Sequence, residues 1–256
     1  MSQNITDIKN MFSNPTTNGG MSQQAADIMI NALDDTDLAG CVGTVTEDMD
    51  TDEVTVVTFI LDKSGSMSPH QATVRDAYDM LIESLKESKQ HKSMIVSTRC
   101  FATTSTLLHG FKKVDEVEPI GNNYVADGNS TALHDTMISA LTDIKAYTQD
   151  LKNQGMRVKC IVIVLSDGDD NEAPQKAKDV KILADDLLKS EQYYLVYYGY
   201  ATDPSTDLKK IAAKIGFPNV LITGTTKTEV RKNTGLVSKS IIRASQTQVG
   251  ANSFFS

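Results

Sequence analysis

Residues 54–67 read Val-Thr-Val-Val-Thr-Phe-Ile-Leu-Asp-Lys-Ser-Gly-Ser-Met. The apolar and β-branched run over 54–61 is typical of a buried β-strand. It leads directly to the carboxylate of Asp62, and hydroxyls follow at Ser64 and Ser66. Oxygen side chains of this kind suit hard cations such as Mg²⁺, Mn²⁺ or Ca²⁺, whereas zinc and copper prefer His or Cys. The stretch therefore indicates one part of a divalent-cation site at a strand end.

The overall composition is that of an ordinary soluble protein. The chain has 256 residues, of which 40% are hydrophobic and 23% charged, and this favours one sizeable domain with an appendage. The formal net charge of −8 argues against nucleic-acid binding, because a phosphate backbone is held by clustered Lys and Arg. We therefore expect partners other than nucleic acids.

The start of the sequence has neither the basic nor the apolar region of a signal peptide, and its apolar runs are too short to span a membrane. We expect a cytoplasmic protein with no membrane insertion. Three cysteines, Cys41, Cys100 and Cys160, have no CxxC spacing and are expected to be small core residues.

Residues 1–53 differ from the rest and form an acidic N-terminal extension. Within it, apolar residues between Ala25 and Leu33 keep a helical spacing after a potential cap at Ser22. This pattern predicts a short helix that docks on the main domain. We assign the main domain to residues 54–247 and a tail to 248–256.

From residue 54 onward, strand and helix patterns alternate. Alternation of this kind predicts an α/β fold with a doubly wound, mostly parallel six-stranded sheet and helices on both faces. The short link between the second and third strands predicts a hairpin, and hence one antiparallel strand at the sheet edge. The expected strands are 54–61, 94–101, 105–109, 159–165, 193–200 and 219–222, and the expected helices are 69–89, 132–153, 175–189, 207–215 and 227–245.

The fold class places two carboxylates together. Asp62 and Asp167 each follow a strongly apolar strand. In open parallel sheets the working site lies at the carboxyl ends of the strands, near the point where strand order reverses. We therefore expect Asp62 and Asp167 to converge.

Three segments together resemble the von Willebrand factor A domain with its metal-ion-dependent adhesion site. They are Asp62-Lys63-Ser64-Gly65-Ser66, the run Asn129-Ser130-Thr131-Ala132-Leu133-His134-Asp135, and Leu165-Ser166-Asp167-Gly168. The resemblance covers about residues 53–245. It implies that the hydroxyls of Ser64, Ser66 and Thr131 contact a cation that Asp62 and Asp167 hold directly or through water.

This set of ligands also predicts how the ion works. Neutral hydroxyls offset little of its double charge, so an open coordination position can accept a carboxylate from a protein partner. We expect Mg²⁺, with Mn²⁺ and Ca²⁺ as alternatives. The resemblance implies a binding module rather than an enzyme, in an assembly such as those of the AAA+ ATPases of the MoxR or chelatase kind.

Some positions depart from the family pattern. Ser166 replaces a frequent Thr, and Asn129-Ser130 replaces a frequent Gly-Gly. Surplus acids follow Asp167, and they either strengthen cation capture or simply start the next helix. These acids are Asp169, Asp170 and Glu172.

Other interpretations of the same residues stay open. The Asp and Ser residues could each cap a helix. A phosphate-ester hydrolase could use Asp167, Asp169 and Asp170 with a metal, although no general acid or arginine clamp is evident. A regulatory switch could pair the acidic extension with a basic last helix, which carries Lys227, Arg231, Lys232, Lys239 and Arg243. Neither a Gly-x-Ser-x-Gly nor a Gly-x-x-x-x-Gly-Lys motif occurs.

Overall fold

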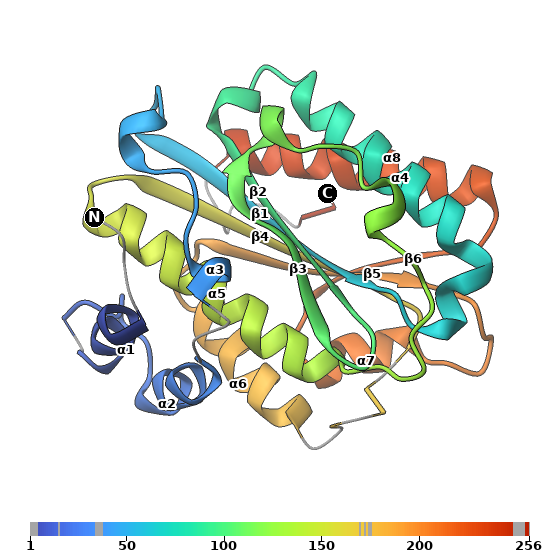
Figure 1. The fold of residues 1–256 in the computed structure, drawn as a ribbon, viewed down its shortest axis with the longest axis horizontal. Helices are drawn as coiled ribbons and strands as arrows, with labels where there is room; N and C mark the ends of the chain where they lie inside the picture. Colours follow the sequence, from blue (N-terminus) through green and yellow to red (C-terminus); the bar gives the residue numbers. More distant parts are fainter. Residues whose placement is uncertain are drawn as a thin grey trace.

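A six-stranded sheet runs through the centre of the computed structural model (Figure 1). The structure describes residues 5–14, 16–33, 38–168, 170–171, 173, 176–247 and 254–255. The order across the sheet is β3-β2-β1-β4-β5-β6. The strands are β1 (Glu53–Asp62), β2 (Met94–Phe101), β3 (Ser105–Lys113), β4 (Arg157–Ser166), β5 (Tyr193–Tyr200) and β6 (Asn219–Thr223).

All neighbouring strands are parallel except β2 and β3, which form the edge hairpin. The predicted fold class is therefore confirmed. β1 pairs with β2 on one side and β4 on the other, so the strand order reverses at β1 and β4. This reversal places the carboxyl ends of β1 and β4 side by side, which is where ligands bind in sheets of this type.

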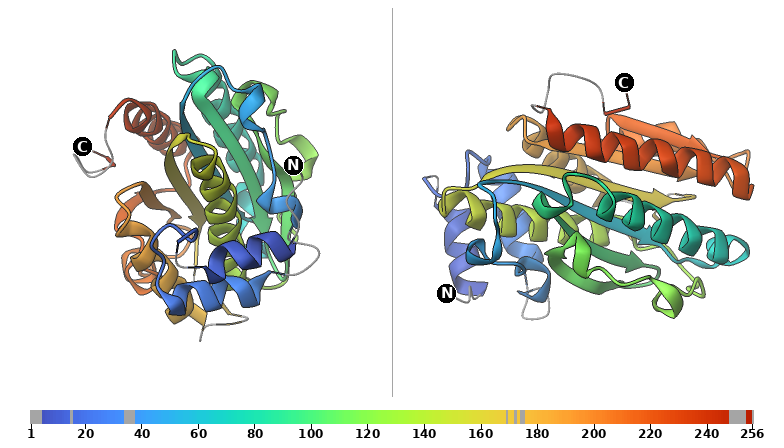
Figure 2. Two further views of the ribbon diagram at one scale, coloured as in Figure 1. Left: turned by 90° about the vertical axis from the view of Figure 1, so that its left-hand side faces the viewer. Right: turned by 90° about the horizontal axis from the view of Figure 1, so that it is seen from above.

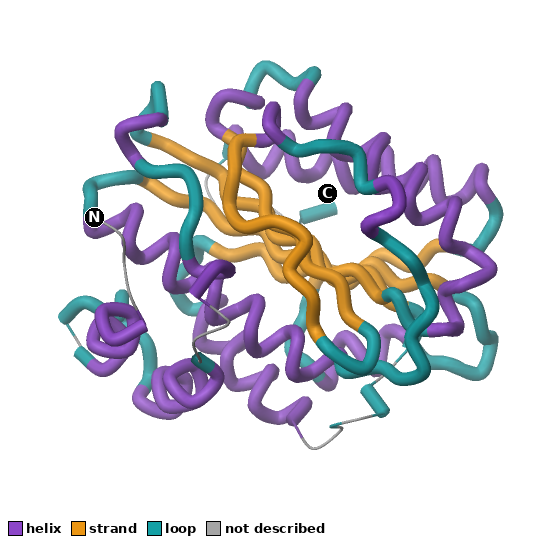
Figure 3. Tube along the Cα trace, in the orientation of Figure 1, coloured by secondary structure: helices purple, strands orange, loops and turns teal. Residues whose placement is uncertain are grey.

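Helices cover both faces of the sheet (Figure 3). Alternate residues of β1 point to opposite faces, since Val56 and Ile60 pack in one core cluster and Val57 and Phe59 in the other. The second cluster includes apolar residues of α4 (Gln71–Lys86) and α8 (Lys227–Gln246). The first cluster lies beneath α5 (Leu133–Asn153), α6 (Ala177–Leu188) and α7 (Leu208–Lys214).

The N-terminal extension packs on the α5 and α6 face. Its helices are α1 (Ile5–Ser13), α2 (Gln23–Ala32) and α3 (Leu38–Cys41). Phe12 and Met29 are fully buried in the same cluster as α5 and α6. As predicted, Ser22 caps α2, because its side chain accepts a hydrogen bond from the amide of Ala25 at 3.3 Å.

The helices of the extension pack on the face of the sheet opposite to the last helix, whose basic residues are a candidate partner of the acidic extension. The extension contributes to the cluster under α5, whereas α8 contributes to the cluster on the other face of the sheet. Figure 2 shows α8 and the extension on opposite sides. The sheet therefore separates α8 from helices α1 and α2 of the extension, whereas the end of the extension, at Asp50 and Glu53, lines a pocket with Ser245 of α8.

Several element boundaries differ from the predictions. Pro69 lies in a 3-10 segment, Gly65–His70, and α4 begins only at Gln71. β3 continues to Lys113, four residues beyond the predicted end at His109. The alternation of apolar and polar residues is weak in β3, because only one of its side chains is buried and the others are half-buried or exposed. No helix among the described residues is long and apolar enough to cross a membrane.

Candidate functional site

Asp62 is the last residue of β1, and its side chain is fully buried. Its two carboxylate oxygens accept different hydrogen bonds. The amide of Ser64 donates to Oδ1 at 2.9 Å, and the hydroxyl of Ser166 donates to Oδ2 at 2.6 Å. Ser166 ends β4, so this bond joins the two strands at the reversal point. The carboxylate is thereby fixed in one orientation.

A chain of hydrogen bonds connects Ser64 to Asp167. The hydroxyls of Ser64 and Ser66 lie 3.0 Å apart, and Ser66 donates to Oδ1 of Asp167 at 3.0 Å. The hydroxyl of Thr202, just beyond β5, donates to Oδ2 of Asp167 at 2.8 Å. Ser66 is exposed, whereas Ser64 and Asp167 are buried. Four of the five predicted site residues therefore form one network that reaches the surface at Ser66.

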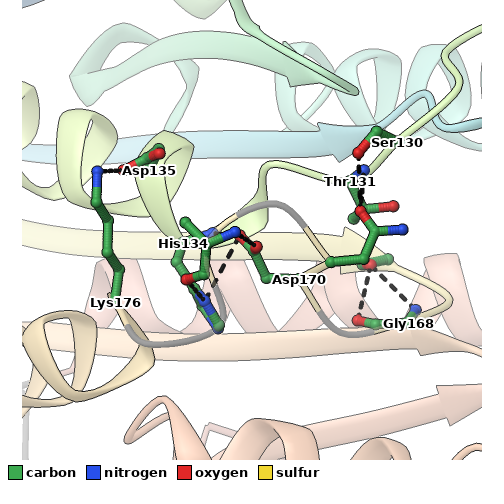
Figure 4. Close-up of polar contacts among 10 residues, drawn as sticks. Ser130, Thr131, His134, Asp135, Gly168, Asp170 and Lys176 are labelled. Atoms are coloured by element: carbon green, nitrogen blue, oxygen red, sulfur yellow. Dashed lines mark hydrogen bonds and ion pairs between the residues drawn. The ribbon is translucent and has the colours of Figure 1, made fainter.

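Thr131, the fifth predicted residue, enters from the loop before α5. Its amide donates to the side-chain oxygen of Asn171 at 2.8 Å, and its carbonyl accepts from the Asn171 amide at 3.2 Å. These bonds attach the Thr131 loop to the segment that follows Asp167, and Figure 4 shows Thr131 near Gly168. Within the described residues, the Thr131 hydroxyl forms no hydrogen bond to the other four side chains.

The network carries negative charge that no basic residue offsets. In the described part of the chain, no lysine, arginine or histidine forms an ion pair with Asp62 or Asp167. Burial raises the pKa of Asp62 to about 6, and the charge of Asp167 adds to this increase. Hydrogen bonds from Ser166 and Ser64 oppose it. The charged form of the Asp62 carboxylate is therefore costly in this site unless a cation binds beside it.

Asp170 does not join this network. Its carboxylate accepts hydrogen bonds from the amide of His134 at 2.6 Å and from the amide of Ala173. It thus satisfies one amide at the start of α5 and one in its own segment, so it acts at the preceding helix α5 and not, as the alternative had it, at a solvated start of the next helix. His134 is likewise buried at this helix start, with Nδ1 3.0 Å from the carbonyl of Ala173 (Figure 4). Asp169 and Glu172 lie outside the described residues.

The loop over residues 121–131 is held against the site by backbone contacts. The hydroxyl of Tyr124 donates to the carbonyl of Asp62 at 2.5 Å, and the amide of Gly128 donates to the carbonyl of Lys63 at 3.3 Å. A side chain at position 128 would place its Cβ 2.1 Å from the Cβ of Ala102. Glycine is therefore required here for close approach of the backbones.

We expect Gly128→Ala to displace this loop and to lower the free energy of unfolding by about 1–3 kcal/mol, the usual cost of overpacking. Urea denaturation measures the effect. Gly168→Ala is the matched control, because its Cβ would meet no atom within 4 Å. Equal stability of the two variants would show that the loop adjusts without cost.

Four residues of the site were not predicted as functional. Ser166 stands out in the sequence only as a departure from the family pattern, and the sequence carries no signal for the roles of Tyr124 and Asn171; the fourth residue is Thr202. Thr202 follows the carboxyl end of β5, the neighbour of β4. The rule that placed Asp62 and Asp167 could have found it by inspecting every strand end.

The comparisons with known proteins agree with this geometry. The family model of the von Willebrand factor type A domain matches residues 57–232, more than half of the chain. The chain belongs to the von Willebrand factor type A domain family. No curated protein sequence matches it significantly.

Several solved structures share the fold at low sequence identity. The pilus adhesin SpaC from Lactobacillus rhamnosus GG has a TM-score of 0.57 and 12% identity over 77% of this chain and 31% of its own. The D319A mutant of the PilB minor pilin from Streptococcus sanguinis has a TM-score of 0.54 and 13% identity over 76% of this chain and 63% of its own. Proximal thread matrix protein 1 from the mussel byssus has a TM-score of 0.51 and 18% identity, covering 73% and 46%. The chain spans less than two thirds of each of these proteins.

Proposed function

We propose that this von Willebrand factor type A domain is a protein-binding module that uses a divalent cation, held at a metal-ion-dependent adhesion site, to contact a carboxylate of its partner. The observation that carries the proposal is the hydrogen-bonded network of Asp62, Ser64, Ser66 and Asp167, whose charge has no basic counterpart in the described residues. Thr131 is the fifth candidate ligand, from the adjoining loop.

The residues present fit a hard cation. Carboxylate and hydroxyl oxygens are the ligands that Mg²⁺ and Ca²⁺ prefer. Because no group of three or more His, Cys, Asp or Glu side chains in the described residues could hold a metal ion, the hydroxyls of Ser64, Ser66 and Thr131 would have to complete the site. A cation here would offset the charge that burial makes costly at Asp62. When bound, it would supply a Lewis-acidic contact for a partner's carboxylate, next to the exposed Ser66.

Binding, rather than catalysis, is the role that we propose. The hydrolase alternative needs a free carboxylate beside Asp167, whereas the carboxylate of Asp170 is occupied by the amides of His134 and Ala173. The fold shared with the adhesin SpaC is compatible with a binding role. We keep Mg²⁺ as the proposed ion, with Mn²⁺ and Ca²⁺ as alternatives, and an AAA+ ATPase as one partner class.

Calorimetry and affinity capture test the proposal. We expect the wild-type chain to bind Mg²⁺ or Mn²⁺, and Asp167→Ala to bind at least about 100-fold more weakly, since it removes a charged ligand. Partner capture from the source cells should fail with chelator and fail equally with Asp167→Ala. Asp76→Ala, an exposed acid on α4, is the matched control and should behave as wild type. Capture that is insensitive to both chelator and Asp167→Ala would contradict the proposal.

A further inference from the structure

A pocket separate from the candidate metal site lies where the extension meets α5 and α6. Its lining includes Gly19 and Gly20 of the extension, Lys145 of α5, and Asp186 and Lys189 at the end of α6. Its volume is about 220 Å³. Because a water molecule takes up about 30 Å³ in the liquid, a small ion fits with water to spare.

Lys145 brings a buried positive charge to this pocket. The residue is 4% exposed, and its ammonium donates to the side-chain oxygen of Gln149 at 3.1 Å. Among the described residues, no carboxylate forms an ion pair with it. Burial lowers the pKa of Lys145 to about 8, and the charge of Lys152 adds to this decrease. Within the part of the chain that the structure describes, a neutral amide is the only acceptor of this buried ammonium, so its charge is poorly compensated.

The nearby carboxylate of Asp186 provides only part of that compensation, because its charge favours the Lys145 ammonium without forming an ion pair with it. Oδ2 of Asp186 accepts from the amide of Ser22 at 3.0 Å, and Oδ1 lies 3.2 Å from Nζ of Lys189. Asp186 is thus engaged by the extension and by Lys189, which is 72% exposed at the mouth of the pocket. With two lysines and one occupied carboxylate, the lining has a net positive charge that favours an anion.

The extension closes directly over this lysine. A Cβ on Gly19 would lie 2.2 Å from the side-chain oxygen of Gln149 and 2.7 Å from Nζ of Lys145. Gly19 also has a φ of 69°, which favours glycine. The backbone of the extension therefore lies against the ammonium and its partner, so a ligand of Lys145 would contact both the extension and α5.

We propose that this pocket is a binding site for a small oxyanion, a phosphate or a carboxylate, which pairs with Lys145 and fastens the extension to α5 and α6. The anion supplies the charged acceptor that Lys145 lacks, and charge-assisted hydrogen bonds of this type are stronger than the one to Gln149. The site is independent of the proposed cation-dependent function.

Calorimetric titration of the full chain tests the site, with sodium phosphate and sodium acetate in separate arms. EDTA and constant ionic strength exclude binding through a metal and general salt effects. We expect wild type to bind at least one of the two anions, and Lys145→Met to bind it at least about tenfold more weakly. Lys152→Met is the matched control, because Lys152 is also partly buried on α5 but does not line the pocket. The affinity of this variant for the anion should stay within about twofold of the wild-type value.

Hydrogen exchange tests the link to the extension. Phosphate or acetate, whichever binds, should slow amide exchange over residues 16–33 in wild type and not in Lys145→Met. If Lys145→Met does not fold, Lys189→Met replaces it, since that side chain is exposed, and it should weaken binding about two- to fivefold. No binding of either anion to wild type, or equal binding by the variant and wild type, would overturn the proposal.

Discussion

Asp62→Asn should make the metal-free protein more stable while abolishing its response to divalent cations. Burial raises the pKa of Asp62 from 3.8 to about 6, so the folded state holds this proton more tightly than the unfolded chain does. The charged carboxylate therefore destabilises the fold fully above pH 6, and the destabilisation disappears as the pH falls toward 3.8. A shift of this size corresponds to about 3 kcal/mol at neutral pH.

Asparagine keeps the shape of the side chain and removes its charge. In EDTA at pH 7.5, we expect Asp62→Asn to raise the free energy of unfolding by about 1–3 kcal/mol, and the gain to vanish near pH 4. Wild type in excess Mg²⁺ should gain about 2.7 kcal/mol at 100 times the dissociation constant, and the variant nothing. Urea denaturation over a pH series measures both effects.

Asp127→Asn is the control for this experiment, because Asp127 is exposed on the adjoining loop. It should change neither the free energy of unfolding in EDTA nor the stabilisation by Mg²⁺. Two results would contradict the prediction. One is an Asp62→Asn protein that is less stable than wild type in EDTA at pH 7.5. The other is an undiminished stabilisation of the variant by Mg²⁺, which would mean that the ion binds elsewhere.

Asp143→Ala should cause the largest loss of stability among single substitutions away from the site. Asp143 on α5 forms an ion pair with Arg99 on β2, and the two side chains are only 5% and 7% exposed. Cys41 of the extension donates to Oδ1 of Asp143 at 3.4 Å. Removal of the carboxylate breaks an ion pair whose two side chains are both buried, and such a loss typically costs about 3–5 kcal/mol.

Urea denaturation of Asp143→Ala and Asp135→Ala tests this expectation on one helix. Asp135 pairs with Lys176 where both side chains are over 40% exposed, and its loss should cost at most about 1 kcal/mol. Adding Arg99→Met to Asp143→Ala should restore part of the stability, because the buried charge is then gone. Equal losses in the two single variants would show that water reaches the Arg99 pair.

The central sheet could be predicted because its strands carry unusually strong patterns. Residues 54–61 are apolar or β-branched, and residues 160–165 are apolar; both stretches lie within central strands that are almost completely buried. The carboxyl-end rule then placed Asp62 and Asp167 together, and the hydrogen bonds through Ser66 and Ser166 join them as expected. Position in the fold, rather than spacing in the sequence, made this prediction possible.

Prediction was less successful where local sequence patterns compete with tertiary packing. α1 was not predicted because nine residues with three buried side chains make a weak periodic signal. The face on which the extension's helices pack could not be predicted, because charge composition does not tell which face of a sheet a segment covers. Thr202 and Asn171 act through hydrogen bonds that depend on the folded loops, so no motif marks them.

The docked extension also bears on how this domain can be excised. The family model begins at residue 57, yet α5 is buried by the sheet on one side and contacted by α2 and α3 on the other, with α1 packed on α2. A fragment cut at the family boundary would expose the apolar outer surface of α5 to water and would be prone to aggregate. The smallest transferable unit of this protein therefore includes the residues from α1 onward, and its N-terminal helices should accompany the domain into any fusion or crystallisation experiment.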